Sequence, residues 1–299
     1  MKQQIKSSLI LLLTATIWGV AFVAQSVGME YIGPFTFNAI RCVLGGLVLI
    51  PVILVLKKKK ETGAENQEKE DKKTLWAGGI ACGVILCIAS NLQQFGIMEA
   101  SVGKSGFFTA LYIVMIPVIG IFIGKRPGIK LWFCVALAVV GMYLLCMKDG
   151  SFTIERADIM LLLCALVFSF HMLVIDYFSP KVDGVKMSCI QFFVCGVLSA
   201  VGMLFTETPD ISNIQAAWLP LLYAGLLSCG VGYTLQIVGQ KGINPVIASL
   251  IMSLESVISA LAGWVILGQV LSPKEILGCV LMFVAIIITQ IPIGNKKTD

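Results

Sequence analysis

Charged residues and histidine are scarce in this chain. Charged residues occupy 13% of its 299 positions, about half the share usual in soluble proteins, and His171 is the only histidine. The ten cysteines form no Cys-x-x-Cys pair and fall almost entirely within apolar stretches, where cysteine serves as a small core residue. With so few ligands on offer, we expect no metal centre and no cofactor.

Two further functional classes are disfavoured by absent features. The sequence Gly-x-x-x-x-Gly-Lys-Ser/Thr, which cradles nucleotide phosphates, does not occur, so the chain has no nucleotide-hydrolysing motor of its own. The net charge is only +5 and comes largely from short loops, so it gives no reason to expect nucleic-acid binding.

Apolar residues, in contrast, are abundant. They make up 58% of the chain, and the mean hydropathy is +0.92, well above soluble domains. Unpaired backbone groups are not tolerated in lipid, and the apolar runs are too long for barrel strands. We predict an all-α polytopic membrane protein with ten transmembrane helices at about residues 8–27, 34–56, 75–98, 105–124, 129–147, 157–175, 185–205, 216–237, 245–267 and 276–293.

The first apolar stretch has two interpretations. Lys2 and Lys6 precede it, as in a secretory signal peptide. The stretch is nevertheless long enough to span a bilayer and has no Ala-x-Ala cleavage site, which favours a retained helix.

Basic residues predict the orientation. With a cytoplasmic N-terminus, 17 of the 22 Lys and Arg residues fall on the cytoplasmic side, as the positive-inside rule requires. We therefore predict a multi-pass protein of the cell membrane, of the bacterial cytoplasmic type, with both termini in the cytoplasm. Residues 57–74 form a charged cytoplasmic loop that we expect to be disordered, with residues 57–60 either anchoring the second helix or contacting lipid headgroups.

The second five helices resemble the first five. Residues 91–112 align with residues 234–255 without a gap, and residues 18–41 match residues 168–191 in spacing. Because five is odd, the second copy crosses the membrane in the opposite sense. We predict two inverted repeats, at residues 1–147 and 157–293, an arrangement typical of carriers that open alternately to either side.

Four segments together resemble a known family. They are WGVAF in the first helix, FNAIRCVLGGL in the second, GKSGFFTALYIVMIP in the fourth and SLESVISALAGWVILGQVLSPKEILG in the ninth. With these four segments in this order, the chain resembles the EamA branch of the drug/metabolite transporter superfamily. The resemblance implies a central cavity lined mainly by helices 1, 3, 4, 6, 8 and 9 and the movement of small metabolites. The family often has Pro and Glu where this chain has Ser256 and Gln269, which implies a ninth helix without the expected kink.

Three charged residues are candidates for coupling or gating: Glu255 and Arg41 lie within predicted helices, where a charge at mid-bilayer costs about 2.5–3.5 kcal/mol, and Lys104 lies just before the fourth helix. Glu255 either takes up a proton, binds a substrate cation, or pairs with a neighbouring helix to fix packing. Arg41 lies at a depth that allows an ion pair with Glu255, or bonds to carbonyls at a helix end. Lys104 opens the fourth helix at the outer face, where it either attracts an anionic group of the substrate or extends to the headgroups.

Uncharged polar and aromatic side chains complete the candidate site. The amides can donate and accept hydrogen bonds, which fits a polar substrate cavity or bonds between helices. The aromatic residues form cavity walls, grip a cation or simply pack. His171, equivalent to Ala21 of the first copy, either lines the cavity or is a hydrogen-bonded packing residue. The cavity candidates are Trp18, Phe22, Gln25, Asn91, Gln93, Gln94, Tyr112, His171, Tyr233 and Gln236.

These features predict a secondary-active or facilitative transporter. We expect an exporter or exchanger of a small polar metabolite, such as an amino acid or a related compound, with the lipid bilayer and coupling protons as further partners and no obligate protein partner. The main alternative is an efflux carrier for drugs or lipid-like compounds, which would favour an aromatic, Met-rich cavity over amides. A membrane-embedded enzyme is disfavoured, because it needs a nucleophile beside a base or a cluster of metal ligands.

Overall fold

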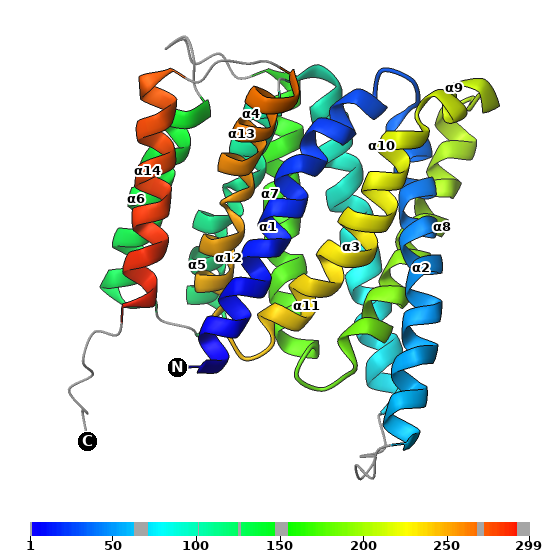
Figure 1. The fold of residues 1–299 in the computed structure, drawn as a ribbon, viewed down its shortest axis with the longest axis horizontal. Coiled ribbons are helices and arrows are strands. Elements are labelled where there is room, and N and C mark those ends of the chain that lie inside the picture. The colour runs from blue at the N-terminus through cyan, green and yellow to red at the C-terminus, as the bar shows by residue number, and fades with distance from the viewer. Residues whose placement is uncertain are drawn as a thin grey trace.

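The protein is a bundle of long helices that run roughly side by side (Figure 1). The computed structural model describes residues 2–62, 71–100, 102–124, 127–146, 155–267 and 272–291. All regular elements within these ranges are helical. They are α1 (Lys2–Gly28), α2 (Pro34–Thr62), α3 (Lys72–Glu99), α4 (Val102–Ala110), α5 (Tyr112–Phe122), α6 (Ile129–Cys146), α7 (Arg156–Phe178), α8 (Gly184–Thr206), α9 (Ile211–Ala216), α10 (Trp218–Leu222), η1 (Tyr223–Tyr233), α11 (Thr234–Gln240), α12 (Pro245–Met252), α13 (Glu255–Leu267) and α14 (Pro273–Gln290).

Eight helical stretches among the described residues are long and apolar enough to cross a membrane. They correspond to α1, α2, α3, α4 with α5, α7, α8, α10 through α11, and α12 with α13. Two further apolar helices, α6 and α14, pack against each other at one side of the bundle (Figure 1). The predicted polytopic all-α membrane fold is confirmed.

The helices of the second half run against those of the first. In Figure 1, α1 rises from the lower end of the bundle, whereas α7, which opens the second half, descends from the upper end. The start of α1 and the end of α14 consequently lie at the same end. The halves are closely packed together, with α2 against α8, α3 against α7 and α6 against α14.

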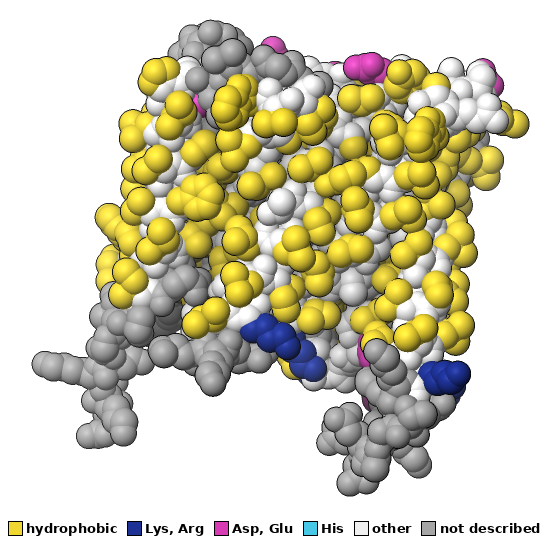
Figure 2. Space-filling model, in the orientation of Figure 1, with side chains coloured by type: hydrophobic (Ala, Val, Ile, Leu, Met, Phe, Trp, Pro, Cys, Tyr) yellow, Lys and Arg dark blue, Asp and Glu magenta, His cyan; other side chains and the backbone are white. Residues whose placement is uncertain are grey.

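Large apolar side chains face outward along the bundle. Figure 2 shows hydrophobic side chains covering the flank, while charged side chains gather near the two ends. Leu9 is 61% exposed and Trp76 is 56% exposed. An apolar surface this extensive is suited to lipid, because in water it would promote aggregation.

Glycine allows the helices to approach closely. A Cβ atom at Gly83 of α3 would lie 2.6 Å from Cβ of Val194 and 2.8 Å from the carbonyl oxygen of Gln191, both on α8. A Cβ atom at Gly225 of η1 would lie 2.7 Å from Cβ of Leu44 on α2. Lipid gives apolar helices no hydrophobic reason to associate, so such backbone contacts supply much of the packing energy.

The charged loop predicted at residues 57–74 begins later than expected. Helix α2 continues to Thr62, since Lys and Glu are good helix formers beyond the apolar stretch. Asp71 caps α3 by accepting hydrogen bonds from the Thr74 hydroxyl and the Lys73 amide, and these bonds hold the pKa of Asp71 below its ordinary value. Residues 63–70, where disorder was predicted, lie outside the described residues.

The prediction of an unkinked ninth helix is wrong. The span is interrupted between α12 and α13, where the Leu254 amide bonds to the carbonyl of Ile251 instead of that of Leu250. The Ser253 hydroxyl donates to the Leu250 carbonyl at 2.8 Å and replaces the missing backbone bond. The fourth span is interrupted at Leu111, which the repeat alignment makes equivalent to Leu254.

Candidate substrate cavity

A narrow cavity lies between the helices, and in this conformation its free volume of about 30 Å³ has room for only a few water molecules. Side chains from seven of the ten spans reach it. The described residues that line it are Trp18, Phe22, Gln25, Arg41, Gln93, Thr109, Tyr112, Phe168, Met172, Ser228, Tyr233, Gln236, Met252 and Glu255.

Many of the lining residues are pairs related by the repeat. The two alignments described above match ten of the fourteen in five pairs. They are Trp18 with Phe168, Phe22 with Met172, Gln93 with Gln236, Thr109 with Met252 and Tyr112 with Glu255. A cavity lined by equivalent positions of both copies lies at their interface, where carriers built from inverted repeats hold their substrates.

Glu255 and Tyr112 meet at the two helix interruptions. Each is the first residue of the helix that follows the interruption, and the Tyr112 hydroxyl donates to Oε1 of Glu255 at 3.0 Å. Glu255 is only 3% exposed, and no Lys or Arg of the described residues forms an ion pair with it. The positive end of the α13 dipole lies at this carboxylate.

Arg41 brings a cation to the same cavity. Its Nη1 donates to Oε1 of Gln25 at 2.7 Å, and the guanidinium lies 5.6 Å from the centroid of the Phe37 ring. Gln25 is held in turn by a hydrogen bond from its amide nitrogen to the carbonyl of Ala21. The Nε atom of Arg41 is buried and has no partner among the described residues. Neither predicted arrangement, an ion pair with Glu255 or a bond to carbonyls at a helix end, is present there, so that prediction is wrong.

Aromatic side chains from the first and eighth spans form one wall. The ring centroids of Trp18 and Tyr233 lie 4.6 Å apart, and the Trp18 indole N–H donates to the carbonyl of Ser228 at 3.4 Å. Both Ser228 and Tyr233 belong to η1, a π-helix. Such wide helical turns are frequent at functional sites.

The arrangement of repeats agrees with a comparison against known families. The model of the EamA-like transporter family matches this chain twice, over residues 5–147 and 155–291. The chain belongs to the EamA-like transporter family. As a member of this part of the drug/metabolite transporter superfamily, it is a multi-pass membrane transporter that acts on a small-molecule substrate within the lipid bilayer.

Named relatives align along most of their length. An uncharacterized transporter of Archaeoglobus fulgidus is 27% identical, over 94% of this chain and 84% of the relative. The uncharacterized transporters YwfM and YoaV of Bacillus subtilis are 24% and 22% identical, over 97% and 94% of this chain and 96% and 95% of their own. One solved crystal structure has a TM-score of 0.77 at 17% identity, covering 95% of this chain and 96% of the other, which establishes a shared fold.

Two amides predicted for the cavity of this EamA-like transporter lie away from it. Asn91 accepts a hydrogen bond from Asn38 at 2.9 Å and donates to the Ser199 hydroxyl at 3.0 Å, so it ties α3 to α2 and α8. Gln94 is fully buried, and neither of its amide atoms has a partner among the described residues. Of the two predicted roles for Asn91, bonding between helices is the one found.

His171 is also a packing residue and does not line the cavity. It is fully buried, and its Nε2 lies 3.1 Å from Oε1 of Gln191. Its ring packs against Phe168 and Tyr233. Gln191 is the repeat equivalent of Arg41. The alignment of the two copies could therefore have identified Gln191 as a candidate, although it was not among the predicted residues.

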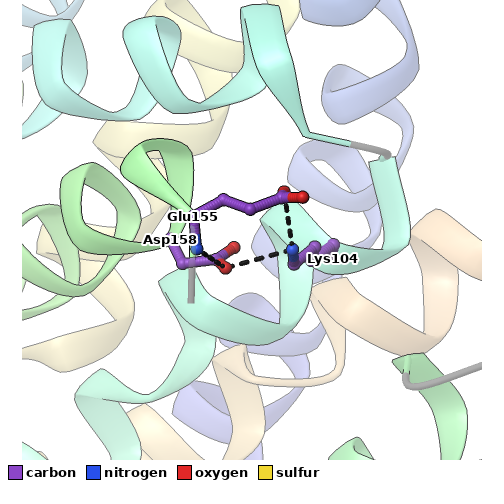
Figure 3. Close-up of polar contacts among 3 residues, drawn as sticks. All are labelled: Lys104, Glu155 and Asp158. Atoms are coloured by element: carbon purple, nitrogen blue, oxygen red, sulfur yellow. Dashed lines mark hydrogen bonds and ion pairs between the residues drawn. The ribbon is translucent and has the colours of Figure 1, made fainter. Parts of the chain in front are cut away.

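Lys104 forms ion pairs with two carboxylates. Its Nζ lies 3.0 Å from Oε2 of Glu155 and 3.0 Å from Oδ2 of Asp158, as Figure 3 shows. Because these acids neutralise the lysine, neither predicted role, attraction of an anionic substrate group or extension to the headgroups, describes it.

Five lining residues were not predicted from the sequence: Thr109, Phe168, Met172, Ser228 and Met252. The repeat supplies a signal for two of them, because Phe168 and Met172 are the equivalents of the predicted Trp18 and Phe22. No group of three or more His, Cys, Asp or Glu side chains within the described ranges is arranged to hold a metal ion.

Proposed function

We propose that this protein carries a small zwitterionic metabolite, such as an amino acid or a related compound, across the cell membrane by alternating access. The observation that carries the proposal is that Arg41 and Glu255 line one cavity without pairing with each other. A buried charge without a counter-charge is costly inside a membrane. A ligand with one carboxylate and one ammonium group carries a counter-charge for each residue.

The lining favours a polar substrate over a lipid-like drug. Seven of its fourteen described residues are charged or carry an amide or aliphatic hydroxyl, two of them with opposite charges, and the other seven are five aromatic residues and two methionines. A broad efflux cavity would be rich in aromatic and Met side chains that repack around different ligands. Neither Ser228 nor Thr109 bonds to a histidine or carboxylate in the described part of the chain, so the lining offers no activated nucleophile and supports a carrier over an enzyme.

The two copies, residues 1–147 and 157–293, would move against each other so that the cavity faces each side in turn. Basic residues support a cytoplasmic position for the end of the bundle where α1 starts, and Lys and Arg side chains gather at this lower end in Figure 2. Both termini would then be cytoplasmic, and the opposite face, where α4 and α7 begin, would be extracellular.

Glu255 also supplies a means of coupling. When substrate leaves, the carboxylate loses its cationic partner while it remains 3% exposed. A proton would take the place of the ammonium group, because an uncompensated charge at this depth is costly. Return of the empty carrier would move that proton inward, so substrate export would be driven by proton entry.

A binding experiment tests the proposed substrate class. The melting temperature of the purified protein in detergent is measured with neutral L-amino acids and with two analogues of each, an acid without the amino group and an amine without the carboxylate. We expect the amino acid to raise the melting temperature and each analogue to bind about 10–100-fold more weakly, since each loses one charge-assisted contact.

Two variants test which charged residue of the cavity binds which charged group of the substrate. In Arg41→Met the amine should bind as well as the amino acid, and in Glu255→Gln the acid should do so. Lys274→Met removes a cation that lies over the Tyr143 ring outside the cavity and should keep wild-type selectivity. Equal binding of all three compounds to the wild type, or stabilisation by none of the amino acids, would refute the proposal.

A further inference from the structure

Lys104, Glu155 and Asp158 form an ion cluster between α4 and α7, at the end of the bundle opposite the start of α1 (Figures 1 and 3). The Asp158 side chain is 1% exposed and that of Lys104 is 22% exposed, whereas that of Glu155 is 61% exposed. Asp158 is fixed further, because it accepts a hydrogen bond from the Glu155 amide at 2.9 Å within the capping box of α7. The Lys104–Asp158 pair therefore differs from a typical exposed ion pair, whose groups are mobile and well hydrated.

The two helices that the cluster joins both continue to the cavity. Thr109 lines it five residues beyond Lys104 on α4, and Phe168 lines it ten residues beyond Asp158 on α7. At 1.5 Å per residue these separations are about 8 Å and 15 Å along the helices. Because α4 belongs to the first copy and α7 to the second, the cluster ties the copies together between the cavity and this face of the protein.

The repeat-related positions at the opposite face cannot form such a cluster. The first alignment makes Ile247 equivalent to Lys104, and the 150-residue offset of the second, continued toward the start of the first helix, makes Ile5 equivalent to Glu155 and Ser8 equivalent to Asp158. In a carrier built from inverted repeats, the second conformation arises when the copies exchange their shapes, so contacts that close one face are replaced by the equivalent contacts at the other. An ion cluster whose repeat-related residues are uncharged stabilises only the conformation that is closed at its own face.

We propose that Lys104, Glu155 and Asp158 form a gate that closes the cavity at the face where α4 and α7 begin. In the orientation proposed above this is the extracellular face. The gate biases the carrier without substrate toward the conformation that opens to the cytoplasm. This inference rests on the proposed alternating access and adds to it the residues that set the balance between the two conformations.

Hydrogen–deuterium exchange of the full-length protein in lipid nanodiscs tests the gate. Lys104→Gln removes the cation, and Asp158→Asn removes one charge while its amide oxygen can still cap α7. We expect each variant to raise amide exchange about fivefold or more at residues 102–110 and 156–163, and to lower it at residues 5–12 and 245–251. The double variant should show no larger change than Lys104→Gln alone, since Lys104→Gln already removes both ion pairs of the cluster.

The matched control is Lys274→Gln, which removes a cation from the start of α14 and should leave both regions unchanged. Unchanged exchange in the gate variants, an increase at both faces, or additive effects in the double variant would overturn the gate. The measurement needs no substrate. A shift in exchange without amino-acid binding would support the gate and refute the substrate class, whereas binding without a shift would do the reverse.

Discussion

At the scale of single residues, the cavity holds two buried charges whose partners are both neutral. Arg41 is bonded to Gln25, and Glu255 is bonded to Tyr112. A structural ion pair would have brought the two charges together and left nothing for a ligand to satisfy. Their separate neutral partners hold both groups in place while leaving the charges available.

The bond from Tyr112 to Glu255 should contribute measurably to stability. Tyr112→Phe removes the donor of a buried hydrogen bond to a carboxyl group, which should lower the free energy of unfolding by about 1–3 kcal/mol. Tyr233→Phe is a matched control, because it makes the same chemical change in the same cavity where the hydroxyl has no hydrogen-bond partner among the described residues. Thermal unfolding in detergent should show a lower melting temperature for Tyr112→Phe only, and equal melting temperatures for the two variants would contradict this role.

The sequence was informative about which residues matter and less so about their partners. Glu255 and Arg41 could be found because a charge inside an apolar stretch stands out. The bond of Arg41 to Gln25 could not, because it depends on the rotation of α2 relative to α1. Gln93 and Gln94 illustrate the same limit, since they are neighbours in the sequence and only Gln93 lines the cavity.

At the scale of helices, hydropathy predicted the ten spans but not the interruptions within them. A change of hydrogen-bond partner by one residue, as at Leu254, leaves the hydropathy of a span unaltered. The π-helix η1 escaped prediction for the same reason. These irregularities nevertheless position Tyr112, Glu255, Ser228 and Tyr233 on the cavity. Much of the site therefore depends on backbone geometry that hydropathy does not predict.

Close packing of α3 on α8 gives a test at this scale. Gly83→Ala would place a methyl group 2.6 Å from Cβ of Val194, and the helices must separate to admit it. We expect a loss of about 1–3 kcal/mol in the free energy of unfolding. Gly103→Ala is the control, since a Cβ there meets nothing within 4 Å and alanine favours the helix. A melting temperature for Gly83→Ala at or above that of Gly103→Ala would contradict the packing argument.

At the scale of the whole molecule, two copies of one fold surround the cavity with equivalent positions that carry different chemistry. Tyr112 in one copy is Glu255 in the other, and Lys104 is matched by Ile247. In the proposed mechanism the repeat would supply two related conformations, and these differences would give the cavity its charge and the proposed gate its single location. Comparison of the two copies in the sequence could predict the fold and the position of the cavity. It could not predict the ion pairs of Lys104 with Glu155 and Asp158, because these depend on how α4 packs against α7.

The central claim is that the cavity exposes a zwitterionic substrate to one side of the membrane at a time, and counterflow in proteoliposomes tests it most directly. Vesicles are loaded with an unlabelled neutral L-amino acid and diluted into a trace of the same labelled compound. We predict a transient accumulation of label inside the vesicles above its external concentration, and loss of this counterflow in Arg41→Met. We also predict that an inward-directed proton gradient speeds efflux by the wild type and has no such effect on Glu255→Gln. Label that only equilibrates, with or without unlabelled compound inside, would contradict the account.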